Sequence, residues 1–413
     1  MASISKRCQV NLTEIIAKVP KRLLESPSNP ASIDLSIAEN HLVRKEVLEL
    51  VSAEIQNQLT VELLDWPKGL WGDPELLKLL SQLFNSYWHP QELLEPHHFV
   101  VGPGASACLD ALVYNICDEG EGVLVPCPYW NGYDNFLRAH SGIILIPVNV
   151  SGLEQALSFD MVQILEETLA ATKTPVRALI ISNPHNPLGR CYSRETLLKI
   201  AGFCSNNKIH LISDEVFALS VFSSKDLPDA TNFTSVLALD QKIIPQDSVH
   251  VVWSVSKDLG LGGARLATVV TRNPSLRNGI ALLGPINVST MVTLSCKAVL
   301  KTDNLRRLVE LNRVRLGEAY HLLTQGFKDS GISYFPANCT TILLANLAPK
   351  ASSKEEQVAA LLKYSEAGVL VAAGSAYHLP ANYHGWFRVG FAVDLTILKQ
   401  ALTTLVKVYQ QLS

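Results

Sequence analysis

The sequence lacks several features that would point to particular protein classes. Its eight cysteines form no C-x-x-C pair, which argues against a zinc site or a disulfide framework. No uninterrupted apolar run reaches the ~18 residues of a membrane-spanning helix. A formal net charge of −3 provides no basic field of the kind that nucleic-acid-binding proteins carry. These absences leave a globular protein that acts on small molecules as the first expectation.

Other absences narrow the expectation further. The first residues, MASISKRCQVNLTEIIAKVPKRL, contain no long apolar core and no small-residue cleavage site, so we expect no secretory signal. The pair His97-His98 has no third ligand at a recognisable spacing, so we predict no metal site. The scattered cysteines predict reduced, mostly buried thiols in a cytoplasmic protein.

Short runs rich in valine and isoleucine recur between residues 97 and 271 and alternate with helix-like stretches. The runs are HFVV, GVLVP, GIILIPVNV, VRALIIS, IHLISD, VHVVWSVS and LATVVT. Because polar residues hardly interrupt them, they fit strands that are buried on both faces. Helix-like stretches at 104–118, 154–173 and 193–207 lie between them. The alternation predicts an α/β fold with a mostly parallel seven-stranded sheet between helices.

The pattern changes near residue 304. An amphipathic stretch, NLRRLVELNRVRLGEAYHLLTQGF, predicts one long helix. Shorter strand and helix patterns follow it to the end of the chain, which indicates a smaller α+β domain. We predict a large domain over 60–300 and a small domain formed by 1–59 and 301–413.

Polar motifs follow five of the predicted strands. They are GPGASA, PYW, NPHNPLG, SDEVF and SVSKDLG, in chain order from residue 102 to 260. Since ligands of α/β proteins gather at the carboxyl ends of strands, we expect these motifs to form one site. GPGASA also fits a dinucleotide-binding fingerprint, but the next strand runs into Cys127-Pro128 rather than an acidic residue for a ribose.

The motifs together match the chemical demands of pyridoxal 5′-phosphate. Its phosphate needs backbone N–H groups at a helix start, hydroxyls and an arginine. Its pyridine nitrogen needs a carboxylate, its ring needs an aromatic face, and its aldehyde needs a lysine of lowered pKa. The sequence therefore predicts a pyridoxal-phosphate site centred on Lys257.

From about residue 33 to 394, the chain resembles the class I/II aminotransferases of the fold-type-I pyridoxal-phosphate superfamily. The motifs NPHNPLGRCY, SDEVF, SVSKDLGLGGARL and WFRVGFA carry the resemblance, in that order. Within this family the chain is most similar to the 1-aminocyclopropane-1-carboxylate (ACC) synthases and their fungal relatives.

The resemblance implies a role for each matching residue. Lys257 would form an imine with the cofactor and act as general base, and Asp214 would bond the pyridine nitrogen. The other expected cofactor contacts are Ser106 and Ala107 at a helix start, Trp130 on the ring, Asn186 on the phenolic oxygen, and Ser254 and Arg265 on the phosphate. Arg388 would hold the substrate carboxylate as a bidentate fork, with Asn186 and Glu39 nearby.

Two aromatic positions depart from the family pattern. Phe217 stands where relatives carry a tyrosine that bonds the phenolic oxygen, and Trp66 aligns with a tyrosine that reaches the site from the neighbouring subunit. Each keeps a ring and loses a hydroxyl. The loss at Trp66 puts true ACC synthase activity in doubt.

The resemblance implies a homodimer with shared active sites that acts on an α-amino acid. The reaction would pass through an external aldimine and removal of the α-proton. We favour elimination at Cβ or Cγ, as in a carbon–sulfur lyase, because of the branch similarity and the two altered contacts. The alternative is transfer of the amino group to a 2-oxo acid, and a catalytically silent cofactor-binding protein is a third possibility.

Overall fold

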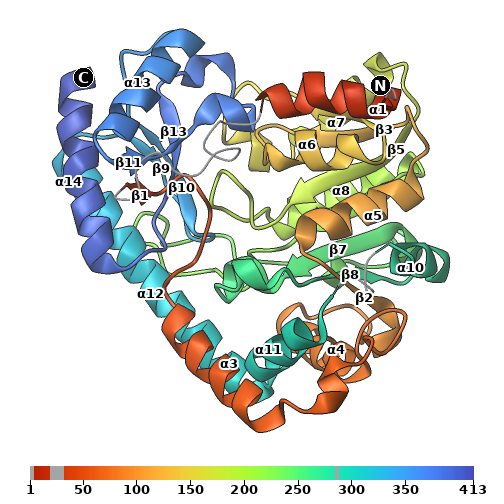
Figure 1. The fold of residues 1–413 in the computed structure, drawn as a ribbon. Coiled ribbons are helices and arrows are strands. Elements are labelled where there is room, and N and C mark those ends of the chain that lie inside the picture. The colour runs from red at the N-terminus through yellow and green to blue at the C-terminus, as the bar shows by residue number, and fades with distance from the viewer. Residues whose placement is uncertain (1–3, 19–31, 284–287) are drawn as a thin grey trace.

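The computed structural model describes residues 4–18, 32–283 and 288–413. Parts of both predicted domain ranges, residues 1–3, 19–31 and 284–287, lie outside the described residues. The described chain is built on a large and a smaller sheet, each with helices packed against it (Figure 1). In the described residues, no helix is long and apolar enough to cross a membrane.

The large sheet has seven strands in the order β2-β8-β7-β6-β5-β3-β4. They are β2 (Phe99–Gly102), β3 (Gly122–Pro126), β4 (Ile144–Val148), β5 (Val176–Ser182), β6 (His210–Asp214), β7 (Val249–Ser254) and β8 (Ala267–Thr271). β8 runs antiparallel to both of its neighbours, whereas the other adjacent pairs are parallel. The predicted α/β fold with a mostly parallel seven-stranded sheet is confirmed.

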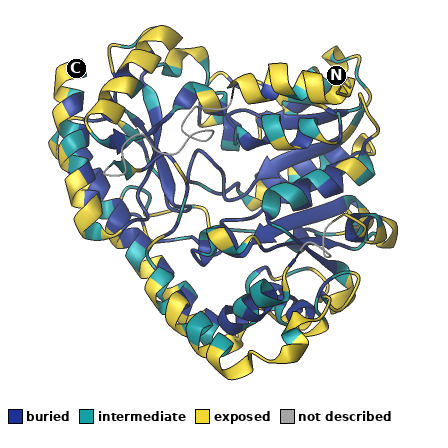
Figure 2. Cartoon of the chain, in the orientation of Figure 1, coloured by how far each residue is buried: buried dark blue, intermediate teal, exposed yellow. Residues whose placement is uncertain are grey.

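Helices on both faces explain why the strands read as unbroken apolar runs. In β5, Ala178 and Ile180 pack into one hydrophobic cluster, and Leu179 and Ile181 pack into another. One cluster takes side chains from α5 (Ala105–Ile116), α6 (Gly132–Ala139) and α10 (Pro274–Ala281). The other takes them from α4 (Pro74–Tyr87), α7 (Met161–Ala171) and α8 (Arg194–Asn206). Successive strand residues point to opposite faces, so both sets must be apolar. Figure 2 shows the strands buried and the outer helix faces exposed.

The smaller sheet is antiparallel, in the order β12-β13-β10-β9, and a two-stranded parallel pair lies with it. Its strands are β9 (Tyr334–Phe335), β10 (Ile342–Asn346), β12 (Ala372–Ala373) and β13 (Trp386–Gly390), and the pair is β1 (Ile33–Asp34) with β11 (Val369–Leu370). A separate hydrophobic cluster joins this sheet to α12 (Thr302–Asp329), α13 (Lys354–Glu366) and α14 (Leu395–Leu412). The long helix predicted from residue 304 is confirmed as α12.

The N-terminal residues divide between the two bodies. The short helical segments α1 (Lys6–Val10) and η1 (Asn11–Ile15) pack beside α6, where Asn11 Nδ2 donates to the Ala139 carbonyl at 3.0 Å. β1, in contrast, joins the smaller sheet. Helix α3 (Arg44–Gln58) packs against α11 (Thr290–Leu300) at the bottom of Figure 1. The first described segment therefore lies beside the large sheet and not with the small domain.

Candidate active site

A cavity of about 420 Å³ lies at the carboxyl edge of the large sheet. Residues of the smaller sheet complete its wall. The predicted site residues that line it are Glu39, Ser106, Trp130, Asn186, Asp214, Phe217, Ser254, Lys257, Arg265 and Arg388. β2, β3, β5, β6 and β7 all point the same way, so the residues that follow them meet at one edge.

Lys257 lies on the short helix α9 (Val255–Asp258), directly after β7. Burial, helped by the nearby Arg388 charge, lowers the pKa of its amine to about 8. The backbone around it is held from two sides. Asn40 Nδ2 donates to the Lys257 carbonyl at 3.0 Å, and the Asp258 carboxylate accepts from Trp253 Nε1 at 2.8 Å. The backbone at Lys257 is thus held in place, and its amine is partly neutral near pH 8.

Asp214 is the last residue of β6 and is buried. Burial raises the pKa of its carboxyl to about 6, against the opposing effect of a hydrogen bond from Tyr133. The Tyr133 hydroxyl donates to Asp214 Oδ2 at 2.7 Å. A carboxylate that remains ionised at neutral pH can pair with a protonated ring nitrogen.

Donors suited to a phosphate group converge at the start of α5. Gly104 precedes this helix with φ 98°, and a Cβ added there would meet Arg265 Nη2 at 2.3 Å. The Arg265 guanidinium therefore lies against the helix start, where backbone N–H groups have no intrahelical acceptor. Ser106 and Ser254 supply hydroxyls to the same cavity. Ala107 is not among the lining residues, although it belongs to the first turn of α5.

Arg388 reaches the site from β13 of the smaller sheet and is buried. Its Nη1 donates to Asn186 Oδ1 at 3.1 Å, and its Nη2 donates to the Ser36 carbonyl at 2.7 Å. The guanidinium carbon lies 4.3 Å from the centre of the Tyr377 ring. A cation held in this way at a cavity wall can bind a carboxylate in a defined orientation.

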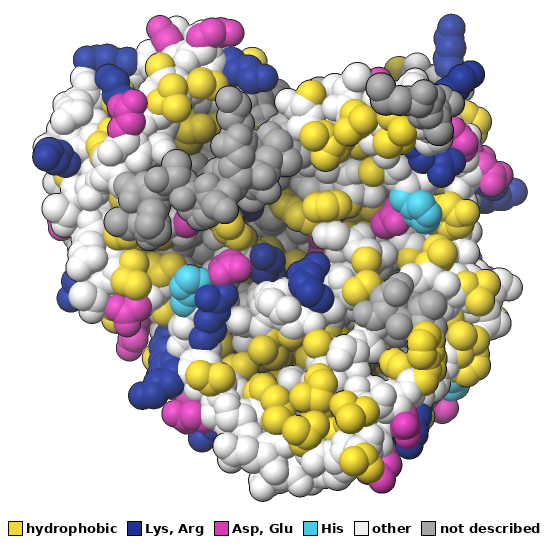
Figure 3. All heavy atoms as spheres, viewed as in Figure 1, with side chains coloured by type: hydrophobic (Ala, Val, Ile, Leu, Met, Phe, Trp, Pro, Cys, Tyr) yellow, Lys and Arg dark blue, Asp and Glu magenta, His cyan; other side chains and the backbone are white. Residues whose placement is uncertain are grey.

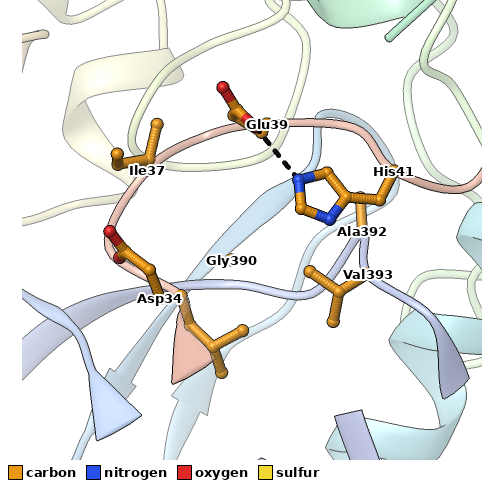
Figure 4. Close-up of a pocket in the computed structure, with 8 residues that line it drawn as sticks. Asp34, Ile37, Glu39, His41, Gly390, Ala392 and Val393 are labelled. Atoms are coloured by element: carbon orange, nitrogen blue, oxygen red, sulfur yellow. Dashed lines mark hydrogen bonds and ion pairs between the residues drawn. The ribbon is translucent and has the colours of Figure 1, made fainter. Parts of the chain in front are cut away.

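Glu39 lines both the main cavity and a smaller one of about 180 Å³, which Figure 4 shows. Its Oε2 accepts from Arg44 Nη2 at 2.6 Å and lies 3.0 Å from His41 Nε2. The hydrogen bond with His41, followed by Arg44, lowers the pKa of Glu39 to about 2. Glu39 therefore presents a permanent negative charge at the site.

The three aromatic candidates lie in different surroundings. Phe217 is buried and lines the main cavity, and Trp130 lines it from the segment before α6. Trp66 is 75% exposed and lines a separate cavity of about 490 Å³ between η3 (Val61–Leu64) and α11. Trp66 is therefore outside the main cavity of its own chain.

Among the residues that sequence reasoning missed at this site are Ser36, Tyr133, Ser256 and Tyr377. Ser256 could have been found, because it belongs to the same S-V-S-K stretch as Ser254. Tyr133 follows Trp130 by three residues, a spacing that puts both on one side of a helical turn. Ser36 and Tyr377 carried no signal, since only the packing of the smaller sheet brings them to the cavity.

The side chains present fit pyridoxal phosphate. Ser106, Ser254 and Arg265 match its phosphate, and Asp214 matches its ring nitrogen. Trp130 offers a ring face, and Lys257 offers an amine of lowered pKa. The phosphate, ring nitrogen, ring face and aldehyde of the cofactor thus each have a partner of suitable chemistry in one cavity.

Comparisons with known proteins agree with this fit. The family described as aminotransferase class I and II matches residues 23–405. The chain is 39% identical over 406 residues to a probable aminotransferase, aclI, of Aspergillus oryzae, covering 97% of this chain and 96% of that protein. It is 29% identical to 1-aminocyclopropane-1-carboxylate synthase 7 of Arabidopsis thaliana, covering 78% of this chain and 74% of that protein.

A solved structure shows the same fold. An aspartate aminotransferase double mutant of Thermus thermophilus superimposes with a TM-score of 0.78 at 21% identity, covering 99% of this chain and 100% of that one. The sequence matches, the fold and the cavity lead to one conclusion. This chain belongs to the class I and II aminotransferases, pyridoxal-phosphate-dependent enzymes of fold type I.

Proposed function

We propose that the enzyme removes the α-proton of an amino acid, with Lys257 as the base and Arg388 as the carboxylate anchor. The observation that carries this proposal is that a buried amine of lowered pKa and a buried guanidinium line one cavity. Arg388 would orient the amino acid, and Lys257 Nζ would take the proton from Cα. The bound cofactor supplies an electron sink for the charge left at Cα.

For the step that follows, we favour elimination at Cβ or Cγ, as in a carbon–sulfur lyase. Phe217 supports this choice, because it alters a cofactor contact at which relatives carry a tyrosine, and an altered contact suggests specialised chemistry. The similarity to ACC synthases also supports it. Transamination is the second candidate, and it is favoured by the similarity to the probable aminotransferase of Aspergillus oryzae.

One experiment separates the candidates. The purified holoenzyme is incubated with amino acids and with cysteine conjugates, and products are followed by mass spectrometry. Release of a thiol or ammonia with a 2-oxo product supports elimination. Conversion of the cofactor to pyridoxamine phosphate, reversed by a 2-oxo acid, would instead establish an aminotransferase. If no amino acid changed the absorbance spectrum of the bound cofactor, both candidates would be refuted. A Lys257→Ala variant serves as the inactive control.

We also propose a homodimer whose subunits share their active sites. Large apolar side chains are exposed on residues 59–70: Leu59, Val61, Leu64, Trp66 and Leu70. Figure 3 shows hydrophobic side chains gathered at the lower end of this face, where α3, α4 and α11 lie in Figure 1. An exposed apolar patch of this kind is typical of a protein interface. In such a dimer Trp66 would lie near the partner's cofactor.

We propose the predicted division into a large domain over 60–300 and a small domain formed by 1–59 and 301–413, except for residues 4–18, which lie beside the large sheet. The pairing of β1 with β11 supports the assignment of the N-terminal residues around β1 to the small domain. We further propose a cytoplasmic location. The cysteines other than Cys8 are buried free thiols, which suits a reducing compartment.

A further inference from the structure

We propose that Tyr133 is a positioning residue for Asp214, holding its carboxylate in one orientation and in its ionised form for the cofactor's ring nitrogen. This inference rests on the proposed role of Asp214. The Tyr133 hydroxyl donates to Asp214 Oδ2 at 2.7 Å, and both side chains are buried. The other oxygen, Oδ1, accepts only a longer bond of 3.4 Å, from the Val216 N–H, among the described contacts. Oδ1 is thus the oxygen left for the ring nitrogen.

Packing fixes the position of the Tyr133 ring. It lies edge-on to Trp130, with ring centroids 5.4 Å apart and an interplanar angle of 82°. Trp130 lines the cavity as the proposed ring-stacking residue. The contact between the two rings therefore connects Trp130 to the Asp214 carboxylate through Tyr133. A substitution that keeps the Tyr133 ring and removes its hydroxyl should therefore leave the packing intact.

The start of α6 is also anchored to the C-terminal part of the chain. The Asp134 carboxylate accepts from the Tyr129 hydroxyl at 2.9 Å and lies 2.7 Å from His378 Nε2. The Tyr129 N–H donates to the Tyr377 carbonyl at 3.0 Å. These bonds hold the first turn of α6, so the Tyr133 hydroxyl has little freedom to leave Asp214.

The surroundings of Asp214 make the hydrogen bond from Tyr133 important for keeping its carboxyl group ionised. Burial raises the pKa of Asp214 to about 6, while the Tyr133 hydroxyl and the Lys257 charge oppose that rise. Tyr192 and His185 lie behind Tyr133 in a small cavity, and burial lowers the pKa of His185 to about 3, so it is uncharged near neutral pH. The pKa of Tyr133 is itself raised far above its ordinary value, mainly by burial, so the residue stays a hydroxyl donor.

The test measures binding of pyridoxine 5′-phosphate to the apoprotein by calorimetry between pH 5 and 8.5. This probe keeps the phosphate and the ring nitrogen but has no aldehyde to react with Lys257. Protonation of Asp214 should weaken its binding below a midpoint near pH 6. Tyr133→Phe should move the midpoint up by about one unit, because a hydrogen bond to a charged group contributes roughly that much. The loss of affinity should then be roughly fivefold at pH 6 and less than twofold at pH 8.

Two further variants complete the design. Tyr364→Phe removes a buried tyrosine hydroxyl that donates to the Leu347 carbonyl at 2.8 Å in the small domain, and its pH profile should match the wild type. In an Asp214→Asn background, Tyr133→Phe should no longer shift the profile. Coincident profiles for the wild type and Tyr133→Phe would overturn the inference. A wild-type apoprotein that binds no probe at any pH would instead overturn the proposed cofactor site.

Discussion

At the residue scale, the active-site chemistry rests on a few buried groups whose proton affinities depend on their surroundings. Removal from water lowers the pKa of the Lys257 amine to about 8 and raises that of Asp214 to about 6. Both shifts follow from burial at the carboxyl edge of the sheet. The shifts allow the Lys257 amine to act as a base and leave the Asp214 carboxylate ionised near neutral pH.

The lowered pKa of Lys257 predicts its reactivity in the apoprotein. Only the neutral amine is nucleophilic, so the rate of modification by acetic anhydride should rise with a midpoint near pH 8. Mass spectrometry of peptides labelled across a pH series measures this rate. Surface lysines in the same sample are the internal reference, and their rates should still be rising near pH 10. A Lys257 profile that follows theirs would show that burial does not act as described.

Phe217 predicts a spectroscopic difference between this enzyme and relatives with tyrosine. A Phe217→Tyr variant would add a donor near the cofactor's phenolic oxygen and stabilise negative charge there. The pH at which the holoenzyme loses its yellow absorbance should therefore fall by roughly one unit. A spectrophotometric titration of both proteins decides the point, and an unchanged titration would count against the placement of residue 217.

At the element scale, the site depends on how the strands end and the helices begin. Ser254 ends β7 and caps α9, since its Oγ accepts from the Ser256 N–H at 3.1 Å. Gly104 precedes α5, and its positive φ and the nearby Arg265 both require a residue without Cβ at this position. These two turns direct phosphate-type donors into one cavity.

We therefore expect Gly104→Ala to weaken cofactor binding in addition to lowering the stability of the fold. The added Cβ would displace the Arg265 guanidinium, and affinity for pyridoxal phosphate should fall at least tenfold. Gly120→Ala is the matched control, because Gly120 has φ 84° but no atom within 4 Å of the added Cβ. Both variants should lose about 1–3 kcal/mol of stability in urea unfolding, because both positions have a positive φ that strains a residue with Cβ. Equal cofactor affinity in the two would contradict the proposed phosphate site.

At the scale of the whole molecule, the two sheets share one site. Arg388 of the small sheet donates to Asn186, which follows β5 of the large sheet. α12 runs from the neighbourhood of α3 and α11 to the smaller sheet and so links the two bodies (Figure 1). The apolar surface on residues 59–70 lies apart from the smaller sheet, at the end of the molecule that we propose for dimerisation.

The dimer proposal predicts the effect of a charge on that surface. Leu64 is 79% exposed, so Leu64→Glu should leave the monomer folded while weakening dimerisation at least tenfold. Leu362→Glu, on the exposed side of α13, is the control and should leave the dimer intact. Analytical ultracentrifugation of the holoenzymes measures both. A wild-type protein that sediments as a monomer would refute the dimer itself.

The linear sequence determined the large sheet, the long helix α12 and most of the residues that line the cavity. Strand runs and motifs are local patterns, and the parallel direction of most strands brings the motifs to one edge. Only the tertiary structure decided that Tyr133 bonds Asp214, that Ser36 and Tyr377 flank Arg388, and that η1 lies beside α6. These contacts join segments far apart in the chain, and no local periodicity encodes them. Their physical basis is the tertiary packing of separate elements within each body.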